Sequence, residues 1–412
     1  MNLTAWYNGH NIDITIPDGT AVDLFDLPGR RLKELPANHW LNRGPVPDDL
    51  DDFLERAQEL LVVVNDAFRP TPTARILAAL QDALRPRRTR FLISTGLHPA
   101  ATPAELRQIF GSFWPSIADG VESHNACAAE TLVDFQTGDA CCRLNHRLRE
   151  CDAILTIGSV EPHYFAGFTG GRKIILPGCA SFADIEQNHA AAVSVESRPL
   201  RRQGNPVWED IHHRTHVLDH VPRASIQVVC DHHGHIFFAA AGDADQSYDH
   251  ACAFVTENFA HGVSDPYDVV ISVVYPPLDR NLYQLQKSYE NVATAVRDGG
   301  AILLLSGCPD GVGDDRFLKL AEQIAGDETP PAATGERALM GIHKVRRTIR
   351  LAKRVDLVLC SGLEPGLLRA LPIAARSDVH RTITELINKY GKHCRIAVVL
   401  DAASQVLYRR AA

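Results

Sequence analysis

The sequence lacks the features of a nucleic-acid-binding, membrane or exported protein. Its formal net charge is -8 over 412 residues, and no basic stripe offsets this charge, so no nucleic-acid partner is expected. No apolar run approaches the about 20 residues that a membrane helix needs, so no membrane partner is expected either. The first residues lack the basic start, apolar middle and cleavage site of a signal peptide.

The sequence also lacks a disulfide framework. Its ten cysteines are scattered without a C-x-x-C pattern, and Cys141 and Cys142 are adjacent. This usage suits a reducing compartment, so a cytoplasmic location is expected. The content of hydrophobic residues, 45%, and of charged residues, 22%, is that of an ordinary globular protein. At 412 residues the chain is long for a single core, so two domains are expected.

Neither common nucleotide-binding fingerprint is present. The G-x-G-x-x-G pattern of dinucleotide sites is absent. The nearest approach to a phosphate loop is EPHYFAGFTGGRKIILPG at 161–178, but Arg172 separates the last glycine from Lys173. The IILPG that follows predicts an extended segment. Bare amides beside two basic residues leave an anion site and a simple tight turn equally open.

Short apolar runs that alternate with helical patterns are present in the first part of the chain. Strands are predicted over 60–66, 90–94 and 152–158, and a helix is predicted to start after a Thr102 cap. This alternation predicts an α/β domain with a largely parallel sheet. Ligands of such sheets bind beyond the carboxyl ends of the strands. Four polar residues follow predicted strand ends, namely Asp66, Arg69, His98 and His163.

The C-terminal part predicts a second α/β domain. Strands are predicted over 268–274, 301–307, 356–362 and 395–401, with a helix over 283–299. The polar stretch 257–267 contains Gly and Pro and predicts a boundary, which gives domains 1–262 and 263–412. The first is expected to bind the cofactor and the second to close over the site, which would lie in the interdomain cleft.

The 19 histidines include two clusters, HHRTH at 212–216 and DHHGH at 231–235. The second cluster lies in an alternating apolar and polar stretch around a central glycine, which predicts a β-hairpin rather than a metal site. His189 lies on a predicted helix and by itself would more often face solvent. Gln284 and Lys287 would share a helix face, which by itself favours a solvated surface.

Read in order, several motifs resemble the lactate racemase family that uses a nickel-pincer nucleotide cofactor. They are DAFRPTPT, TGLHP, EPHYFAGFTGGRKIILPG, NHA and NLYQLQKS, and they span most of the chain. The spacing is the specific part of the resemblance, because Lys173 comes ten residues after His163 and His189 comes sixteen after Lys173.

The resemblance implies an isomerase, a racemase or epimerase of 2-hydroxy acids. The implied cofactor is nickel pyridinium-3,5-bisthiocarboxylic acid mononucleotide, which is supplied by separate cofactor-biosynthesis enzymes. His189 matches the nickel ligand, in a square-planar set that suits Ni(II). Lys173 matches the lysine that can form a thioamide bond to the cofactor. The other residues expected at the cofactor are Gly170, Gly171 and Asp66.

His98 and His163 match the two general acid/base histidines of the family. Plain deprotonation next to a carboxylate faces a large barrier at pH 7, whereas hydride removal avoids the carbanion. A histidine then takes only the hydroxyl proton, a role that suits a pKa near working pH. The residues that match the substrate site are Arg69, Tyr283, Gln284 and Lys287. The sequence does not choose among lactate, malate, aryl-lactates, longer hydroxy acids and sugar acids.

Three other classes of function remain as alternatives. A nicotinamide-dependent hydroxy-acid dehydrogenase needs the dinucleotide fingerprint that is missing. A zinc hydrolase built on the histidines of 212–235 conflicts with the predicted hairpin. A non-enzymatic two-domain ligand-binding protein leaves the joint spacing of His98, His163, Lys173 and His189 without a reason.

Overall fold

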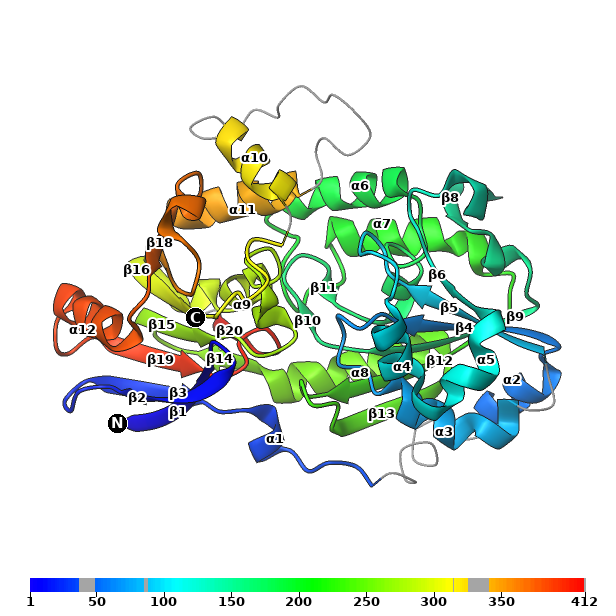
Figure 1. Ribbon diagram of the computed structural model, residues 1–412, viewed down its shortest axis with the longest axis horizontal. Helices are drawn as coiled ribbons and strands as arrows, with labels where there is room; N and C mark the ends of the chain where they lie inside the picture. Colours follow the sequence, from blue (N-terminus) through cyan, green and yellow to red (C-terminus); the bar gives the residue numbers. More distant parts are fainter. Residues whose placement is uncertain (37–48, 85–87, 314, 325–340, 411–412) are drawn as a thin grey trace. The chain divides into compact units, whose positions relative to one another are not determined.

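The chain forms two compact α/β units in the computed structural model (Figure 1), which describes residues 1–36, 49–84, 88–313, 315–324 and 341–410. The first unit is Leu32–Glu257. The second unit combines Met1–Arg31 with Asn258–Ala412. Within the described part of the chain, no helix is long and apolar enough to span a membrane.

The first unit is built on a six-stranded sheet of order β13-β12-β9-β4-β5-β6. All neighbouring strands are parallel except β12 and β13, which form an antiparallel hairpin. The predicted strands and the predicted hairpin are therefore confirmed. The strands are β4 (Glu59–Asn65), β5 (Arg88–Ser94), β6 (Val121–Ser123), β9 (Ala153–Ser159), β12 (Arg223–Cys230) and β13 (Ile236–Asp243).

Both faces of this sheet are covered, which explains the continuous apolar run of β4. Val62 and Val64 lie on the first face, which is covered by α2 (Asp49–Arg56), α3 (Thr73–Leu84) and α4 (Pro103–Phe110). Leu61 and Val63 lie on the second face. The second face carries the hairpin β7 (Leu132–Thr137) and β8 (Ala140–Asn145), and the helices α6 (Phe182–Ala190) and α7 (Pro206–Thr215). Figure 1 shows α6 alongside α7.

Local capping signals start two helices of this unit where the sequence places them. Thr102 and Glu105 form a capping box at the start of α4, as the predicted Thr102 cap requires. The side chain of Ser181 accepts the N–H of Asp184 at the start of α6. The last helix of the unit, α8 (Ala244–Phe259), follows β13 directly.

The second unit contains an all-parallel sheet of order β18-β17-β16-β15-β19-β3. Its four predicted strands are confirmed. The strands are β3 (Ala21–Phe25), β15 (Tyr267–Val273), β16 (Val296–Leu305), β17 (Asp356–Cys360), β18 (Ile373–Arg376) and β19 (Arg395–Val399). A further pair, β14 (Ala260–Val263) and β20 (Val406–Arg409), is also parallel.

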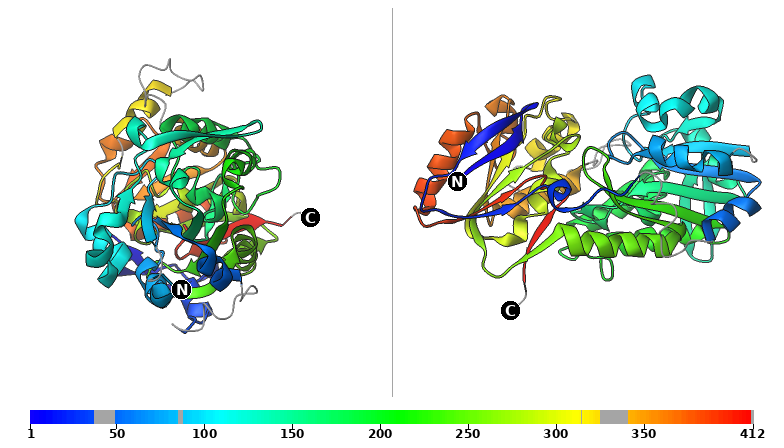
Figure 2. Two further views of the ribbon diagram at one scale, coloured as in Figure 1. Left: turned by 90° about the vertical axis from the view of Figure 1, so that its right-hand side faces the viewer. Right: turned by 90° about the horizontal axis from the view of Figure 1, so that it is seen from below.

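Helices and a hairpin cover the two faces of the second sheet. One face carries the hairpin β1 (Asn2–Tyr7) and β2 (His10–Thr15) together with α12 (Val379–Tyr390), and Figure 2 shows the hairpin beside this helix. The other face carries α9 (Gln286–Glu290), α10 (Asp315–Ile324) and α11 (Ile342–Ala352). The short α1 (Pro28–Arg31) ends the N-terminal segment of this unit.

The N-terminal segment differs from the expected domain 1–262. Strand β3 hydrogen-bonds along its length to β19, and the Tyr267 hydroxyl donates to the Asp23 carboxylate over 2.7 Å. The first 31 residues therefore belong with the C-terminal unit. Pairing between strands at opposite ends of a chain has no local signal in the sequence.

Three local predictions are wrong. The helix expected over 283–299 shrinks to α9, because the chain turns at 293–295 and then enters β16 at Val296. Gln284 precedes α9, so it does not share a helix face with Lys287. The IILPG segment after Lys173 is not extended but forms turns, in which the N–H of Leu176 donates to the carbonyl of Arg172 and the N–H of Cys179 donates to the carbonyl of Ile175.

Candidate active site

Four predicted site residues of the first unit lie just past strand ends at one edge of its sheet. Strands β4, β5, β9 and β12 run parallel, so their carboxyl ends lie at the same edge, about 4.8 Å apart from strand to strand. The four residues expected there follow these ends: Asp66 and Arg69 after β4, His98 after β5 and His163 after β9.

His98 is held by Asp66. The Nδ1 of His98 lies 2.6 Å from the Asp66 carboxylate, which is buried with 7% exposure. Phe68 packs on the imidazole, with 4.4 Å between the ring centroids. An ionised carboxylate can only accept, so Nδ1 carries the proton of the neutral ring and Nε2 is its basic nitrogen. This arrangement prepares His98 to take a proton.

His163 has the opposite arrangement of its ring nitrogens. It is buried with 6% exposure, and its Nδ1 accepts the N–H of Ala166 over 3.2 Å. The proton of the neutral ring is therefore on Nε2. Nδ1 is thus engaged in both rings, and Nε2 is the basic nitrogen in His98 but carries the proton in His163.

Phe165 joins His163 to His189. Its ring meets the His163 ring edge-on at 4.5 Å between centroids and the His189 ring edge-on at 5.1 Å. His189 lies in the last turn of α6, which confirms the predicted helix. The structure therefore brings together two histidines that the sequence separates widely.

The segment between them is a compact series of turns. Strands β10 (Pro162–His163) and β11 (Gly167–Phe168) pair with each other, and the 3-10 turn that follows them contains Lys173. The N–H of Lys173 donates to the Gly170 carbonyl over 3.2 Å. Lys173 is half-buried and lines a small cavity with Phe168, Trp208, His212 and Tyr248.

The glycines of this segment are required by the protein itself. A Cβ on Gly170 would stand 2.6 Å from the Gln227 side-chain oxygen, and one on Gly171 would stand 2.7 Å from the Tyr248 ring. Both glycines also have positive φ, 77° and 54°. The expectation that they leave room for a cofactor is therefore incomplete, because protein fills the side on which their Cβ atoms would lie.

Gln227 is a site residue that the sequence did not indicate. It lies on β12 with 0% exposure, and its oxygen accepts the N–H of Gly171 over 3.4 Å. Its Nε2 has no hydrogen-bond partner within the residues that the structure describes. A buried donor without a partner costs about 1–3 kcal/mol. The amide of Gln227, the amine of Lys173 and the imidazole of His189 are the kinds of group that a polar, metal-bearing nucleotide would need.

The histidine turn of the β12–β13 hairpin lies at the same edge. The buried Asp231 carboxylate accepts the N–H groups of His233 and His235 and faces the His235 ring at 2.9 Å. Gly234 packs against Pro70, which follows Arg69. In the described part of the chain, neither this turn nor 212–216 gathers three or more His, Cys, Asp or Glu side chains that could hold a metal ion.

The remaining predicted residues lie in the second unit. The Tyr283 ring has the Lys344 amine 3.8 Å from its centroid, and this amine also donates to the Tyr283 carbonyl over 2.8 Å. The N–H of Gln284 donates to the Asn281 side chain over 3.0 Å. Lys287 is buried on α9 with 4% exposure. Lys344 was not found from the sequence, since it is distant along the chain.

Comparisons with known proteins support a two-domain racemase. The model of the lactate racemase N-terminal domain matches residues 9–199, and that of the C-terminal domain matches residues 264–407. A lactate racemase of Thermoanaerobacterium thermosaccharolyticum is 30% identical over 334 residues, 74% of this chain and 77% of the relative. A lactate racemase of Lactiplantibacillus plantarum is 31% identical over 287 residues, 66% of this chain and 65% of the relative.

Solved structures share the fold. The lactate racemase apoprotein of T. thermosaccharolyticum superposes with a TM-score of 0.86 at 23% identity, over 99% of this chain and 100% of that one. A protein from Thermotoga maritima superposes with a TM-score of 0.68 at 16% identity, over 88% and 96% of the two chains. The fold and the family matches define an isomerase of the racemase class. The chain belongs to the lactate racemase family.

Gly171→Ala should destabilise the protein more than Gly138→Ala. Both glycines have similar positive φ, 54° and 61°, but nothing lies within 4 Å of a Cβ on Gly138. The φ cost is about 1–2 kcal/mol at either position, and the clash with Tyr248 adds about 1–3 kcal/mol at Gly171 only. Urea unfolding of the two variants measures the difference. Equal losses of stability would show that Gly171 does not pack tightly on Tyr248.

Proposed function

We propose that this enzyme interconverts the enantiomers of lactate or a related 2-hydroxy acid with a bound nickel-pincer nucleotide. The relatives named lactate racemase support the reaction. The observation that carries the proposal is the pairing of His98 with Asp66 at the sheet edge that also holds His163. His98 is prepared to take a proton at Nε2, and a histidine gives one only as imidazolium, so the reaction needs the two rings in different protonation states.

His189, Lys173 and Gln227 are the residues proposed to hold the cofactor. His189 serves as the nickel ligand, since neutral imidazole suits Ni(II). The Lys173 amine would pair with the cofactor electrostatically or as a thioamide, and the Gln227 amide, beside Gly171, would donate a hydrogen bond to it. The chemistry that this cofactor supplies when bound is reversible uptake of a hydride from the substrate's alpha carbon.

His98 is proposed to handle the hydroxyl proton of one enantiomer. Its Nε2 takes the proton, and the imidazolium that results is stabilised by the Asp66 carboxylate on Nδ1. Asp66 also fixes the direction of the ring. The site therefore places a base and its counter-charge before substrate arrives.

His163 is proposed to serve the opposite enantiomer, whose hydroxyl is presented to the other side. The Ala166 N–H holds its Nδ1, so His163 takes the hydroxyl proton at Nε2 only after its ring proton has moved to Nδ1, which breaks the hydrogen bond from Ala166. Packing of Phe165 against both His163 and His189 sets the separation of the proton-exchanging ring from the nickel ligand. Each direction of the reaction uses both histidines, one as base and one as acid.

Arg69 is proposed to bind the substrate carboxylate, in the bidentate manner that a guanidinium favours. The backbone N–H of Arg69 donates to the backbone carbonyl of Asp66 over 3.2 Å. This hydrogen bond links the proposed substrate-binding residue to the residue that orients His98. Tyr283, Gln284 and Lys287 are proposed to contribute further substrate contacts, with Tyr283 kept in place by Lys344.

Co-expression with cofactor-making enzymes tests the proposed function. Protein made with them should contain nickel near one per chain and racemise D- and L-lactate, whereas protein made without them should be folded and inactive. His189→Ala should lose the nickel and keep the fold, because this imidazole is the proposed protein ligand. His213→Ala, which removes an exposed histidine of α7, is the matched control and should keep the metal. Racemisation by metal-free protein would overturn the proposal.

Asp66→Asn should lower kcat in both directions by roughly 100-fold or more while nickel content stays unchanged. The asparagine amide can donate to Nδ1 of His98 and thereby move the ring proton to Nε2, which removes the base. Chiral chromatography of both reactions, with elemental analysis of the variant, measures this.

Asp231→Asn is the control for that change, because Asp231 is also buried and also pairs with a histidine at the same edge. It should keep most of the activity. A loss of nickel from Asp66→Asn would instead assign Asp66 to the cofactor, and an unchanged kcat would assign it neither role.

A further inference from the structure

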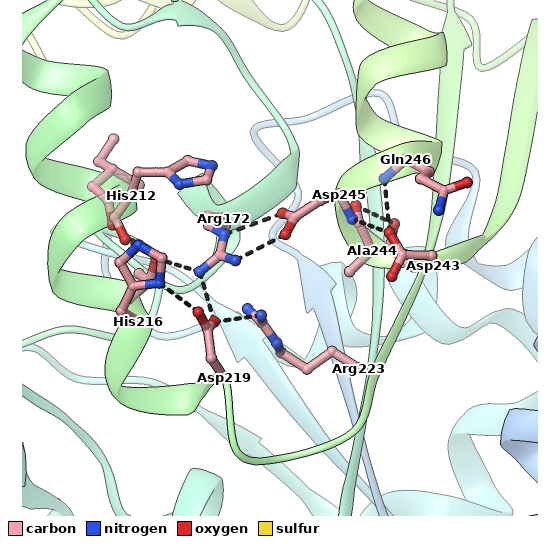
Figure 3. Close-up of polar contacts among 12 residues, drawn as sticks. Arg172, His212, His216, Asp219, Arg223, Asp243, Ala244, Asp245 and Gln246 are labelled. Carbon is pink, nitrogen blue, oxygen red and sulfur yellow. Dashed lines mark hydrogen bonds and ion pairs between the residues drawn. The ribbon is translucent and has the colours of Figure 1, made fainter. Parts of the chain in front are cut away.

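Arg172, next to Lys173, is bound entirely within the protein (Figure 3). Its guanidinium donates to both oxygens of Asp245 over 2.8 and 3.1 Å and to Asp219 over 2.9 Å. The side chain is only 9% exposed. Asp219 in turn accepts from Arg223 and pairs with His216. The Arg172 guanidinium is therefore paired within the protein. It does not serve the anion site that its position beside the glycines suggested.

The carboxylates around Arg172 stay ionised at neutral pH. Burial raises the pKa of Asp245, but the hydrogen bonds and the charge of Arg172 outweigh burial and hold this pKa below its usual value. The pKa of Asp219 is likewise lowered, since His216 and Arg172 outweigh its burial. Carboxylates with depressed pKa values stabilise the fold above their usual range and lose this effect on acidification. The ion pairs therefore persist wherever the enzyme works near neutral pH.

These bonds connect the turn before Lys173 to two separate elements. Asp245 lies in the first turn of α8 and Asp219 follows the 3-10 turn 216–218 after α7. Gly171 sits on the Tyr248 ring of α8 and donates its N–H to Gln227. The backbone just before Lys173 is thus held from the side of α7, from α8 and from the sheet.

We propose that Arg172 is a positioning residue, which fixes the backbone of Lys173 and so sets where the Lys173 amine meets the bound cofactor. This inference rests on the proposed function, because it takes Lys173 as a cofactor-binding residue. A lysine side chain has four rotatable bonds and reaches many positions. Its anchor at the backbone therefore decides how much of that freedom is lost before the cofactor arrives.

The test uses nickel retention by holoenzyme made with the cofactor pathway. Arg172→Met should lose nickel during extended dialysis at least ten times faster than the unmodified enzyme. Arg172→Lys keeps the charge and should restore part of the retention. Asp245→Asn and Asp219→Asn each weaken one side of the anchor and should give intermediate rates, which keeps the test informative if Arg172→Met does not fold.

Arg147→Met is the matched control. Arg147 also donates to two carboxylates of the same unit, Glu122 and Glu150, over 2.8 and 2.9 Å. Its loss should lower the urea midpoint of the apoprotein but leave nickel retention unchanged. Equal retention in Arg172→Met and the unmodified enzyme, or equal losses in Arg172→Met and Arg147→Met, would overturn the positioning role. If the unmodified enzyme takes up no nickel, the proposed function fails and this inference fails with it.

Discussion

The parallel hydrogen bonding of β4 to both β5 and β9 is the constraint on which the rest of the first unit depends. Val62 pairs with Phe91 on one side and with Leu155 on the other, and this register places three strand ends at one edge. The Asp66–His98 hydrogen bond is possible only because the two strands that precede these residues end together. A shift of one residue in either strand would turn alternate side chains to the opposite face.

The segment 161–178 contains two kinds of residue, the proposed functional side chains and the residues that fix their backbone or tautomer. His163 and Lys173 are the proposed functional side chains, and both lie where the backbone is fixed by other contacts. The Ala166 N–H sets the His163 tautomer, while Gly171 against Tyr248 and Arg172 between Asp245 and Asp219 set the path of the chain before Lys173. The glycines and the arginine, for which the sequence left an anion site and a tight turn equally open, serve internal packing and charge pairing.

Much of the fold was predictable because its signals are local. Apolar runs identified the buried strands, the Thr102 cap located a helix start, and the alternation around Gly234 identified the hairpin β12–β13. Asp66, Arg69, His98 and His163 could also be predicted as site residues, because the ends of the strands before them have a local signal in the sequence. The pairing of β3 with β19, the buried amide of Gln227 and the contact of Lys344 with Tyr283 depend on chain segments far apart. The helix expected over 283–299 was wrong because pairing of β16 with β15 overrides the local pattern.

The central claim is that the histidines at this edge move only the hydroxyl proton, while the alpha hydrogen leaves and returns as hydride. A proton taken by His98 or His163 would exchange with water, whereas a hydride held on carbon would not. Mass spectrometry of both enantiomers after partial conversion of alpha-deuterated lactate in ordinary water tests this directly. The account predicts that deuterium is largely retained in the product of opposite configuration. Rapid loss of deuterium from that product would contradict it.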